Sequence, residues 1–264
     1  MRWYFEYVQR LLSTALSFAV FGIGGLIFGL LVLPPIFIFI RDRDDRRVAA
    51  RKLIGKGFGF FVWFMNVQRL FDYRVQGREF IDDQRRQLIV ANHPTLIDVV
   101  ILISLFPQAN CVIKEAVMRN PFMRGVVMAA DYISNNEPGE LVESCTKYLT
   151  SGKTLLLFPE GTRTRHDEPL DFRPGAATVA ARTNVDVLPV AISCQPRILS
   201  KQQPWHHVPR ERPMITIRIL PPRPVNEVVP GEGDPRLFRL ELNDALLELI
   251  QTELDDMAFS RRAI

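Results

Sequence analysis

The longest uncharged stretch of this chain constrains its fold more than any other feature. Residues 11–40 contain no Asp, Glu, Lys or Arg. As an α-helix this stretch would be about 45 Å long, whereas the hydrocarbon core of a bilayer is about 30 Å thick. The stretch is longer than the apolar region of a signal peptide, and no small-residue cleavage site follows it. We therefore expect a retained membrane-embedding segment and not a buried helix of a soluble protein.

Two arrangements of this segment remain open. In the first, Leu11–Leu33 crosses the bilayer and the proline pair at 34–35 ends the helix. In the second, the glycine-rich residues 22–25 mark a bend, and two short helices enter one leaflet and return. The residues that follow, 58–64, are rich in aromatic side chains, which suit either the lipid–water boundary or packing against the rest of the protein.

The basic residues are concentrated beside the apolar segment. Residues 1–78 hold 12 Lys and Arg against 5 Asp and Glu, although the net charge of the chain is only +4. Seven of these basic residues lie in 41–56, which the positive-inside rule places on the cytoplasmic side of the inner membrane. Such an excess next to an apolar helix indicates anionic lipid as the partner, and no nucleic-acid-binding pattern is present. We predict anchor helices and a basic segment over 1–57 and a separate domain over 58–264, facing the cytoplasm.

Residues 58–264 alternate between short apolar runs and longer helical stretches. The runs are rich in β-branched residues and predict buried strands at 87–91, 111–114, 154–158, 187–192 and 215–220. The stretches between them predict helices at 97–105, 140–150 and 175–183, and apolar residues at helical spacing predict another near the C-terminus. Proline-rich residues 196–213 and 221–235 predict loops. This alternation is typical of an α/β fold, a mostly parallel sheet with covering helices.

Cysteine and histidine are too scarce for a metal centre. The three cysteines are far apart and form no C-x-x-C pair, which argues against a disulfide framework and a structural zinc site. The four histidines supply no set of ligands, so we expect no bound metal ion. Any imidazole chemistry must come from a very short list of residues.

One of these histidines stands where a parallel sheet places its ligands. His93 directly follows the strand predicted at 87–91, and Pro94 favours a turn there. Asp98, in the first turn of the next helix, can reach back to the imidazole. A carboxylate in that place orients a histidine that acts as a general base. The alternative is structural, because Thr95 and Asp98 also match a capping box that holds the start of the helix.

Two later segments carry arginines suited to an anion. F-P-E-G-T-R at 158–163 follows a predicted strand, and the guanidinium of Arg163 matches phosphate oxygens bidentately. Arg173 immediately precedes a predicted helix of small residues, whose N-terminus is a second anion site. A solvated turn and a plain helix start are the respective alternatives.

Taken in chain order, these motifs resemble one known family. N-H-P-T-L-I-D, F-P-E-G-T-R, F-R-P-G-A and L-P-V, together with Lys114-Glu115, are similar to the blocks of the glycerophospholipid acyltransferases, whose best-known members are bacterial 1-acylglycerol-3-phosphate acyltransferases. The resemblance covers roughly residues 60–225. It implies an α/β acyltransferase domain with an N-terminal membrane-embedding helical motif.

The resemblance also implies a reaction and a set of site residues. A fatty acyl group would pass from acyl-CoA or acyl carrier protein to the free hydroxyl of a lysophospholipid, most directly 1-acylglycerol 3-phosphate, giving phosphatidic acid. The thioester is a co-substrate, and no cofactor is implied. His93 would be the general base and Asp98 its orienting partner. The implied acceptor-binding residues are Glu160, Gly161, Thr162, Arg163, Lys114 and Arg173, with Arg163 on the phosphate.

Departures from the family pattern leave the acceptor open. Thr95 stands where the family often has serine, and Pro174 occupies the variable place of F-R-x-G. Another lysolipid, such as a lyso-ornithine lipid, is therefore an alternative acceptor. A non-enzymatic lipid-binding membrane protein is the alternative from a different class, although a binder has no need of a paired His93 and Asp98. The sequence does not indicate an oligomeric state.

Overall fold

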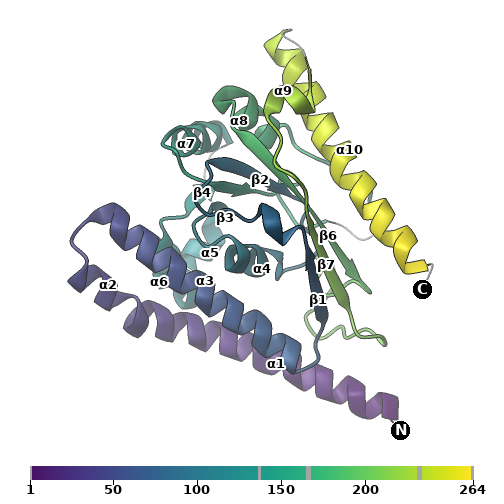
Figure 1. The fold of residues 1–264 in the computed structure, drawn as a ribbon. Helices are drawn as coiled ribbons and strands as arrows, with labels where there is room; N and C mark the ends of the chain where they lie inside the picture. The colour runs from purple at the N-terminus through teal and green to yellow at the C-terminus, as the bar shows by residue number, and fades with distance from the viewer. Residues whose placement is uncertain (1, 136–137, 165–167, 202, 231–233, 263–264) are drawn as a thin grey trace.

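The computed structural model describes residues 2–135, 138–164, 168–201, 203–230 and 234–262. Over these residues a seven-stranded sheet is covered by helices on both faces, and an N-terminal helix pair runs along one side of the molecule (Figure 1). The strands are β1 (Asp72–Gln76), β2 (Gln87–Ala91), β3 (Asn110–Lys114), β4 (Ile133–Asn135), β5 (Leu155–Leu157), β6 (Asp186–Gln195) and β7 (Met214–Ile219). The predicted α/β class is confirmed.

The strand order is β1-β7-β6-β2-β5-β3-β4, and the one antiparallel pairing in it joins β6 to β7. The five strands predicted from apolar runs are confirmed, and the ends of each lie within three residues of the predicted ends. The sequence did not reveal β1 or β4. β1 lies at the edge of the sheet and has no fully buried side chain, so it lacks the apolar run by which a buried strand is recognised.

Alternate side chains of β2 point into two separate cores. Leu88 and Val90 enter one core, and Ile89 and Ala91 enter the other. The first core is closed by α7 (Pro138–Thr150), α8 (Gly175–Thr183) and α10 (Pro235–Arg262). The second is closed by α3 (Arg43–Val67), α4 (Asp98–Leu105) and α6 (Pro121–Ala130). The domain also contains the 3₁₀ turn η2 (Arg78–Phe80) and two short helices, α5 (Glu115–Arg119) and α9 (Val225–Val228). Helix α9 interrupts the loop predicted at 221–235.

The uncharged segment forms helix α1 (Arg2–Ile27), a π-helical turn η1 (Phe28–Val32) and α2 (Pro34–Phe39). Of the two arrangements left open, the one with a bend at residues 22–25 is not found, because α1 is continuous there. The glycines permit close packing instead: a Cβ on Gly25 would lie 2.6 Å from the carbonyl oxygen of Phe122 on α6, and one on Gly29 would lie 3.1 Å from Cα of Gly125. The helix that starts with α1 ends with η1, just before the proline pair, as the first arrangement expects, and Pro34 begins the short helix α2. By length and composition, residues 6–39 suffice to cross a membrane.

Helix α3 runs back beside α1 (Figure 1). It begins after Asp42, whose carboxylate accepts hydrogen bonds from the backbone N–H groups of Asp44 and Asp45. The predicted division at residue 57 falls inside this helix, and the division remains a prediction. The aromatic stretch 58–64 packs in part against the rest of the protein, because Phe61 is buried. Trp63 is 55% exposed, and a position at the lipid–water boundary stays a prediction.

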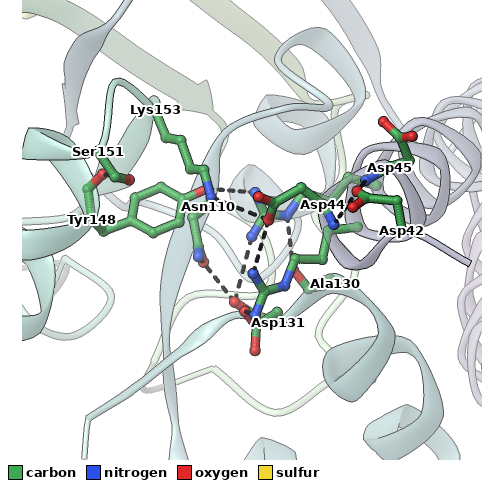
Figure 2. Close-up of polar contacts among 11 residues, drawn as sticks. Asp42, Asp44, Asp45, Asn110, Ala130, Asp131, Tyr148, Ser151 and Lys153 are labelled. Carbon is green, nitrogen blue, oxygen red and sulfur yellow. Dashed lines mark hydrogen bonds and ion pairs between the residues drawn. The ribbon is translucent and has the colours of Figure 1, made fainter.

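Polar contacts fix the first half of α3 to the domain (Figure 2). Arg51 is buried and donates from Nε to the Ala130 carbonyl oxygen at 2.8 Å and from Nη1 to the Tyr148 hydroxyl. Asn110, the first residue of β3, donates to the carbonyl oxygen of Asp131 at 3.0 Å. This junction therefore lies at the amino end of the parallel strands, opposite the edge where His93 follows β2.

Candidate active site

The buried side chain of Asn92 fixes the chain immediately before His93. Its Nδ2 donates to the carbonyl oxygen of Ile192 at 2.8 Å, and its Oδ1 accepts from the Ile192 N–H at 2.7 Å. These two bonds continue the β2–β6 pairing through a side chain, so the backbone is free to turn outward at the next residue. His93 is thereby held at the carboxyl edge of the sheet.

His93 and Asp98 are in direct contact. His93 Nδ1 lies 2.9 Å from Asp98 Oδ2, and the Asp98 side chain is fully buried. The same carboxylate accepts from the Thr95 N–H at 2.6 Å and from the Thr95 hydroxyl at 2.5 Å. The His–Asp pair is therefore formed, and the same carboxylate also holds the turn before α4. Thr95 is not the N-cap as expected, because α4 begins at Asp98 with Ile97 in the cap position.

The hydrogen bond to Asp98 assigns the tautomer of His93. Because a carboxylate accepts, Nδ1 carries the proton and Nε2 carries the lone pair. The imidazole stacks on the ring of Phe158, with the ring centroids 4.4 Å apart, and its side chain is 15% exposed. A histidine oriented in this way is suited to take a proton at Nε2.

Glu160 accepts a hydrogen bond from the backbone of the His93 turn. Its Oε1 accepts from the His93 backbone N–H at 2.7 Å and from the Thr164 hydroxyl at 2.9 Å. Thr164 N–H in turn donates to the His93 carbonyl oxygen at 2.7 Å. Burial raises the pKa of the Glu160 carboxyl, and the hydrogen bonds from His93 and Thr164 oppose this shift. The loop that follows β5 is thus bonded to the turn that follows β2.

The same loop turns at Gly161, beside Arg173. Gly161 has a φ of +65°, and its N–H donates to the Phe158 carbonyl oxygen at 2.9 Å. A Cβ at this position would lie 3.5 Å from Nη1 of Arg173, so the arginine side chain lies over the glycine. Thr162, the next residue, is partly exposed. Four of the predicted anion-site residues, Gly161, Thr162, Arg163 and Arg173, therefore gather at one loop.

Arg163 is held by the segment that follows β6. Its Nη1 donates to the carbonyl oxygens of Leu199 at 2.7 Å and Ser200 at 3.2 Å. Partial burial lowers the pKa of the Arg163 guanidinium, and the negative charge of Asp98 opposes the shift. Arg163 thus lies within the electrostatic reach of the carboxylate that orients His93.

Lys114 is the one predicted site residue that the structure leaves apart. It is exposed at the carboxyl end of β3, and β5 lies between β3 and β2. Two strand spacings separate it from β2 by about 10 Å. In the described parts of the chain, no hydrogen bond or ion pair joins Lys114 to another predicted site residue.

Sequence reasoning assigned no role in holding this site to Asn92, Thr164, Leu199 or Ser200. Thr164 adjoins the F-P-E-G-T-R motif, and its hydroxyl could have been included with that motif. Leu199 and Ser200 act through backbone carbonyl groups, for which a side-chain pattern gives no signal. Cys111 and Cys145 take no part, because burial raises the pKa of each thiol to about 12. Within the described residues, no group of three or more His, Cys, Asp or Glu side chains could hold a metal ion.

Comparison with a family model relates this arrangement to known proteins. Residues 72–193 match the model described as acyltransferase. This range begins at β1 and ends within β6, so it includes His93, Asp98 and the whole 158–164 loop. The matched segment is therefore the part of the chain that holds the site.

Curated relatives and a solved structure are also similar. The chain is 30% identical over 109 residues to the chloroplastic 1-acyl-sn-glycerol-3-phosphate acyltransferase LPAT1 of Arabidopsis thaliana, covering 39% of this chain and 30% of that protein. It is 27% identical over 124 residues to the Borreliella burgdorferi enzyme of that name, covering 45% and 50%. The chain thus spans half or less of the length of these relatives. The crystal structure of the Thermotoga maritima LPA acyltransferase PlsC superposes with a TM-score of 0.78 at 22% identity, covering 96% of this chain and 98% of that one, which establishes the shared fold.

Proposed function

We propose that this chain, whose residues 72–193 match the acyltransferase model, transfers a fatty acyl group from a thioester to the free hydroxyl of a lysophospholipid. The observation that carries the proposal is the 2.9 Å contact between His93 and Asp98 at the edge of the sheet, beside the loop that presents Arg163. The names of the similar proteins favour 1-acylglycerol 3-phosphate as the acceptor. Acyl-CoA or acyl carrier protein is the proposed donor.

In the proposed reaction, His93 acts as a general base. A hydroxyl is a poor nucleophile until a base takes its proton, and a positioned base contributes about 10²–10⁴-fold to the rate. Nε2 of His93 takes the proton while the hydroxyl oxygen attacks the thioester carbonyl carbon. The carbon–sulfur bond then breaks, and the proton passes from His93 to the departing thiolate. Asp98 stabilises the imidazolium that forms between these two steps.

Arg163 and Arg173 are the proposed partners of the acceptor phosphate. Both guanidinium groups lie at the 158–164 loop, one held through Nη1 by two carbonyls and the other lying over Gly161. Charge-assisted, bidentate hydrogen bonds are the strongest contacts that a phosphate makes with a protein. Glu160 contributes to this acceptor site by holding the His93 turn, and Lys114 would contribute only long-range charge. Apart from the exchange of the thioester C–S bond for a C–O bond, the reaction needs only the proton transfers through His93, so we propose no metal ion and no cofactor.

We also propose that α1 and α2 attach the protein to the cytoplasmic face of the inner membrane. The exposed side chains of α2 and of the turn η1 before it include Leu31, Ile38 and Phe39, which are 69–81% exposed. Exposed apolar side chains of this size are costly in water and favourable in lipid. The basic residues of 41–56 follow directly, where anionic headgroups would lie. A lysolipid acceptor could then reach the site from the bilayer.

A vesicle assay tests the attachment. Ile38→Glu and Phe39→Glu should reduce co-sedimentation with vesicles of phosphatidylglycerol and phosphatidylethanolamine. Neither change disturbs a buried contact, so the folded domain should persist. Phe259→Glu on α10 is the matched control, because Phe259 is 74% exposed and lies far along the chain from the apolar segment. Equal sedimentation of all three variants would contradict attachment through α2.

An acceptor panel tests the reaction. The purified protein is offered lysophosphatidic acid, glycerol 3-phosphate or lyso-ornithine lipid, each with acyl-CoA or acyl carrier protein as donor. We expect transfer to lysophosphatidic acid. Transfer to lyso-ornithine lipid alone would reassign the acceptor. Vesicle binding without transfer to any acceptor would instead favour a non-enzymatic lipid-binding protein.

A further inference from the structure

Leu199 has a backbone conformation that leucine rarely adopts. Its φ is +50°, and it is 8% exposed in the segment 196–213, which connects β6 to β7. The Cβ of an ordinary residue disfavours positive φ, so such a conformation persists only where the surroundings impose it. Residues held in this way are concentrated at functional sites. The contacts of Leu199 therefore show what this conformation achieves.

The carbonyl oxygen of Leu199 holds two parts of the site at once. It accepts from the Leu96 N–H at 3.1 Å and from Arg163 Nη1 at 2.7 Å. Leu96 lies in the turn between His93 and Asp98, and Arg163 lies on the 158–164 loop. One oxygen atom thus joins the His93–Asp98 turn to the arginine that faces the acceptor. The direction of this carbonyl group depends on the backbone dihedral angles of Leu199.

Contacts with α1 hold the 196–213 segment at its other end. The buried guanidinium of Arg10 donates to the carbonyl oxygens of Arg210 at 2.8 Å and Glu211 at 3.1 Å. Trp205 packs edge-on against Phe18, with ring centroids 6.1 Å apart. The segment is therefore fixed between the N-terminal helix and the site, which explains how Leu199 can be kept in its unfavourable conformation.

We propose that Leu199 is a positioning residue whose positive φ directs one carbonyl oxygen to both Leu96 and Arg163. It thereby sets where the phosphate-binding arginine lies relative to the His93–Asp98 pair. The roles of those three residues rest on the proposed function, whereas the positioning itself does not. The side chain of Leu199 contributes packing, but its backbone conformation is what the site requires.

Substitutions at Leu199 separate this role from a packing role. Glycine and asparagine tolerate positive φ, whereas the β-branched side chain of valine opposes it. If the backbone matters, Leu199→Gly and Leu199→Asn should outperform Leu199→Val. If apolar packing matters, Leu199→Val should be the best tolerated of the three. Leu199→Ala and Leu199→Gly form a second pair that differs by one methyl group, so the test remains decisive if the valine variant does not fold.

Two measurements on the full-length protein in detergent decide between these roles. Hydrogen exchange at the Leu96 amide reports the Leu199 bond without any need for activity. The acceptor KM and kcat for lysophosphatidic acid report the placement of Arg163. We expect Leu199→Val to raise KM about tenfold and to speed exchange at Leu96, with kcat less affected. Leu199→Asn should remain within about threefold of the unaltered protein in KM, and Leu199→Gly should exchange more slowly at Leu96 than Leu199→Ala.

The opposite ranking in exchange, with valine protecting Leu96 better than asparagine and alanine better than glycine, would overturn the inference. A chain that transfers no acyl group at all would overturn the proposed function instead. In that case the exchange at Leu96 still decides whether Leu199 positions the turn. A ranking confirmed in exchange but absent from KM would refute the connection to Arg163.

Discussion

Glu160 offers a perturbation whose magnitude can be worked out from its contacts. In Glu160→Ala the backbone N–H of His93 loses its acceptor, and leaving a buried donor unpaired costs about 1–3 kcal/mol. The Thr164 hydroxyl loses the same acceptor but can rotate towards another. We therefore expect the free energy of unfolding to fall by about 1–3 kcal/mol. Glu160→Gln should lose little, because its amide oxygen can accept from the same two donors.

The raised pKa of Glu160 gives this pair of variants a pH signature. Because the folded-state pKa lies above the ordinary value of 4.5, the folded protein binds the proton more tightly than the unfolded chain. Stability from this group is present at low pH and is lost as pH rises from 4.5 through the folded-state pKa. Glutamine carries no charge, so Glu160→Gln should gain on the unaltered protein as pH rises across this window.

Thermal unfolding of the detergent-solubilised protein, followed by circular dichroism between pH 4 and pH 8, measures both effects. We expect Glu160→Ala to unfold several degrees below Glu160→Gln at every pH. Equal loss in the two variants would refute the assignment of the two hydrogen bonds. A stability difference between Glu160→Gln and the unaltered protein that does not change with pH would refute the buried-carboxyl argument.

Three further substitutions test separate contacts. Asp98→Asn removes the charge that stabilises the imidazolium, so kcat should fall about 10- to 150-fold, the effect of losing about 1.5–3 kcal/mol of transition-state stabilisation. An unchanged kcat in steady-state assays would count against a catalytic role of the His93–Asp98 pair. Arg163→Ala should raise the KM for a phosphate-bearing acceptor by a similar factor and leave the KM for a monoacylglycerol unchanged. Equal effects on the KM of both acceptors would argue against a phosphate contact. Arg10→Ala removes the donor to two backbone carbonyls and should lower the free energy of denaturant-induced unfolding by about 1–3 kcal/mol, with Arg10→Lys intermediate. Unaltered stability would show that α1 does not anchor the 196–213 segment.

The sequence predicted most of the sheet because buried strands have a clear composition. β2 and β5 are buried throughout and, apart from Gln87, apolar, and their ends lie within two residues of the prediction. Edge strand β1 has a mixed composition, because it pairs with a neighbouring strand, β7, on one side only. Helix α3 was divided at residue 57 because its first half is charged and its second half is aromatic, although Asp42 caps one continuous helix.

The candidate site was predictable where side chains carry it. The short spacing between His93 and Asp98 and the strand that precedes His93 were enough to predict their contact. Leu199 was not predictable, because its contribution is a carbonyl oxygen and a backbone dihedral. The role of the glycines at 22–25 was left open for a similar reason: it depends on α6, which approaches α1 from a distant part of the sequence.

The most direct test of the account is acyl transfer by His93→Ala. The His93 side chain contacts Asp98 and Phe158, and the backbone hydrogen bonds of His93 remain in the alanine variant, so we expect the variant to fold. Far-ultraviolet circular dichroism verifies this. His206→Ala is the matched control, since His206 is exposed in the 196–213 segment. We predict that His93→Ala lowers kcat for transfer to lysophosphatidic acid about 10²–10⁴-fold while His206→Ala stays near normal. Near-normal turnover by a folded His93→Ala protein would contradict the account.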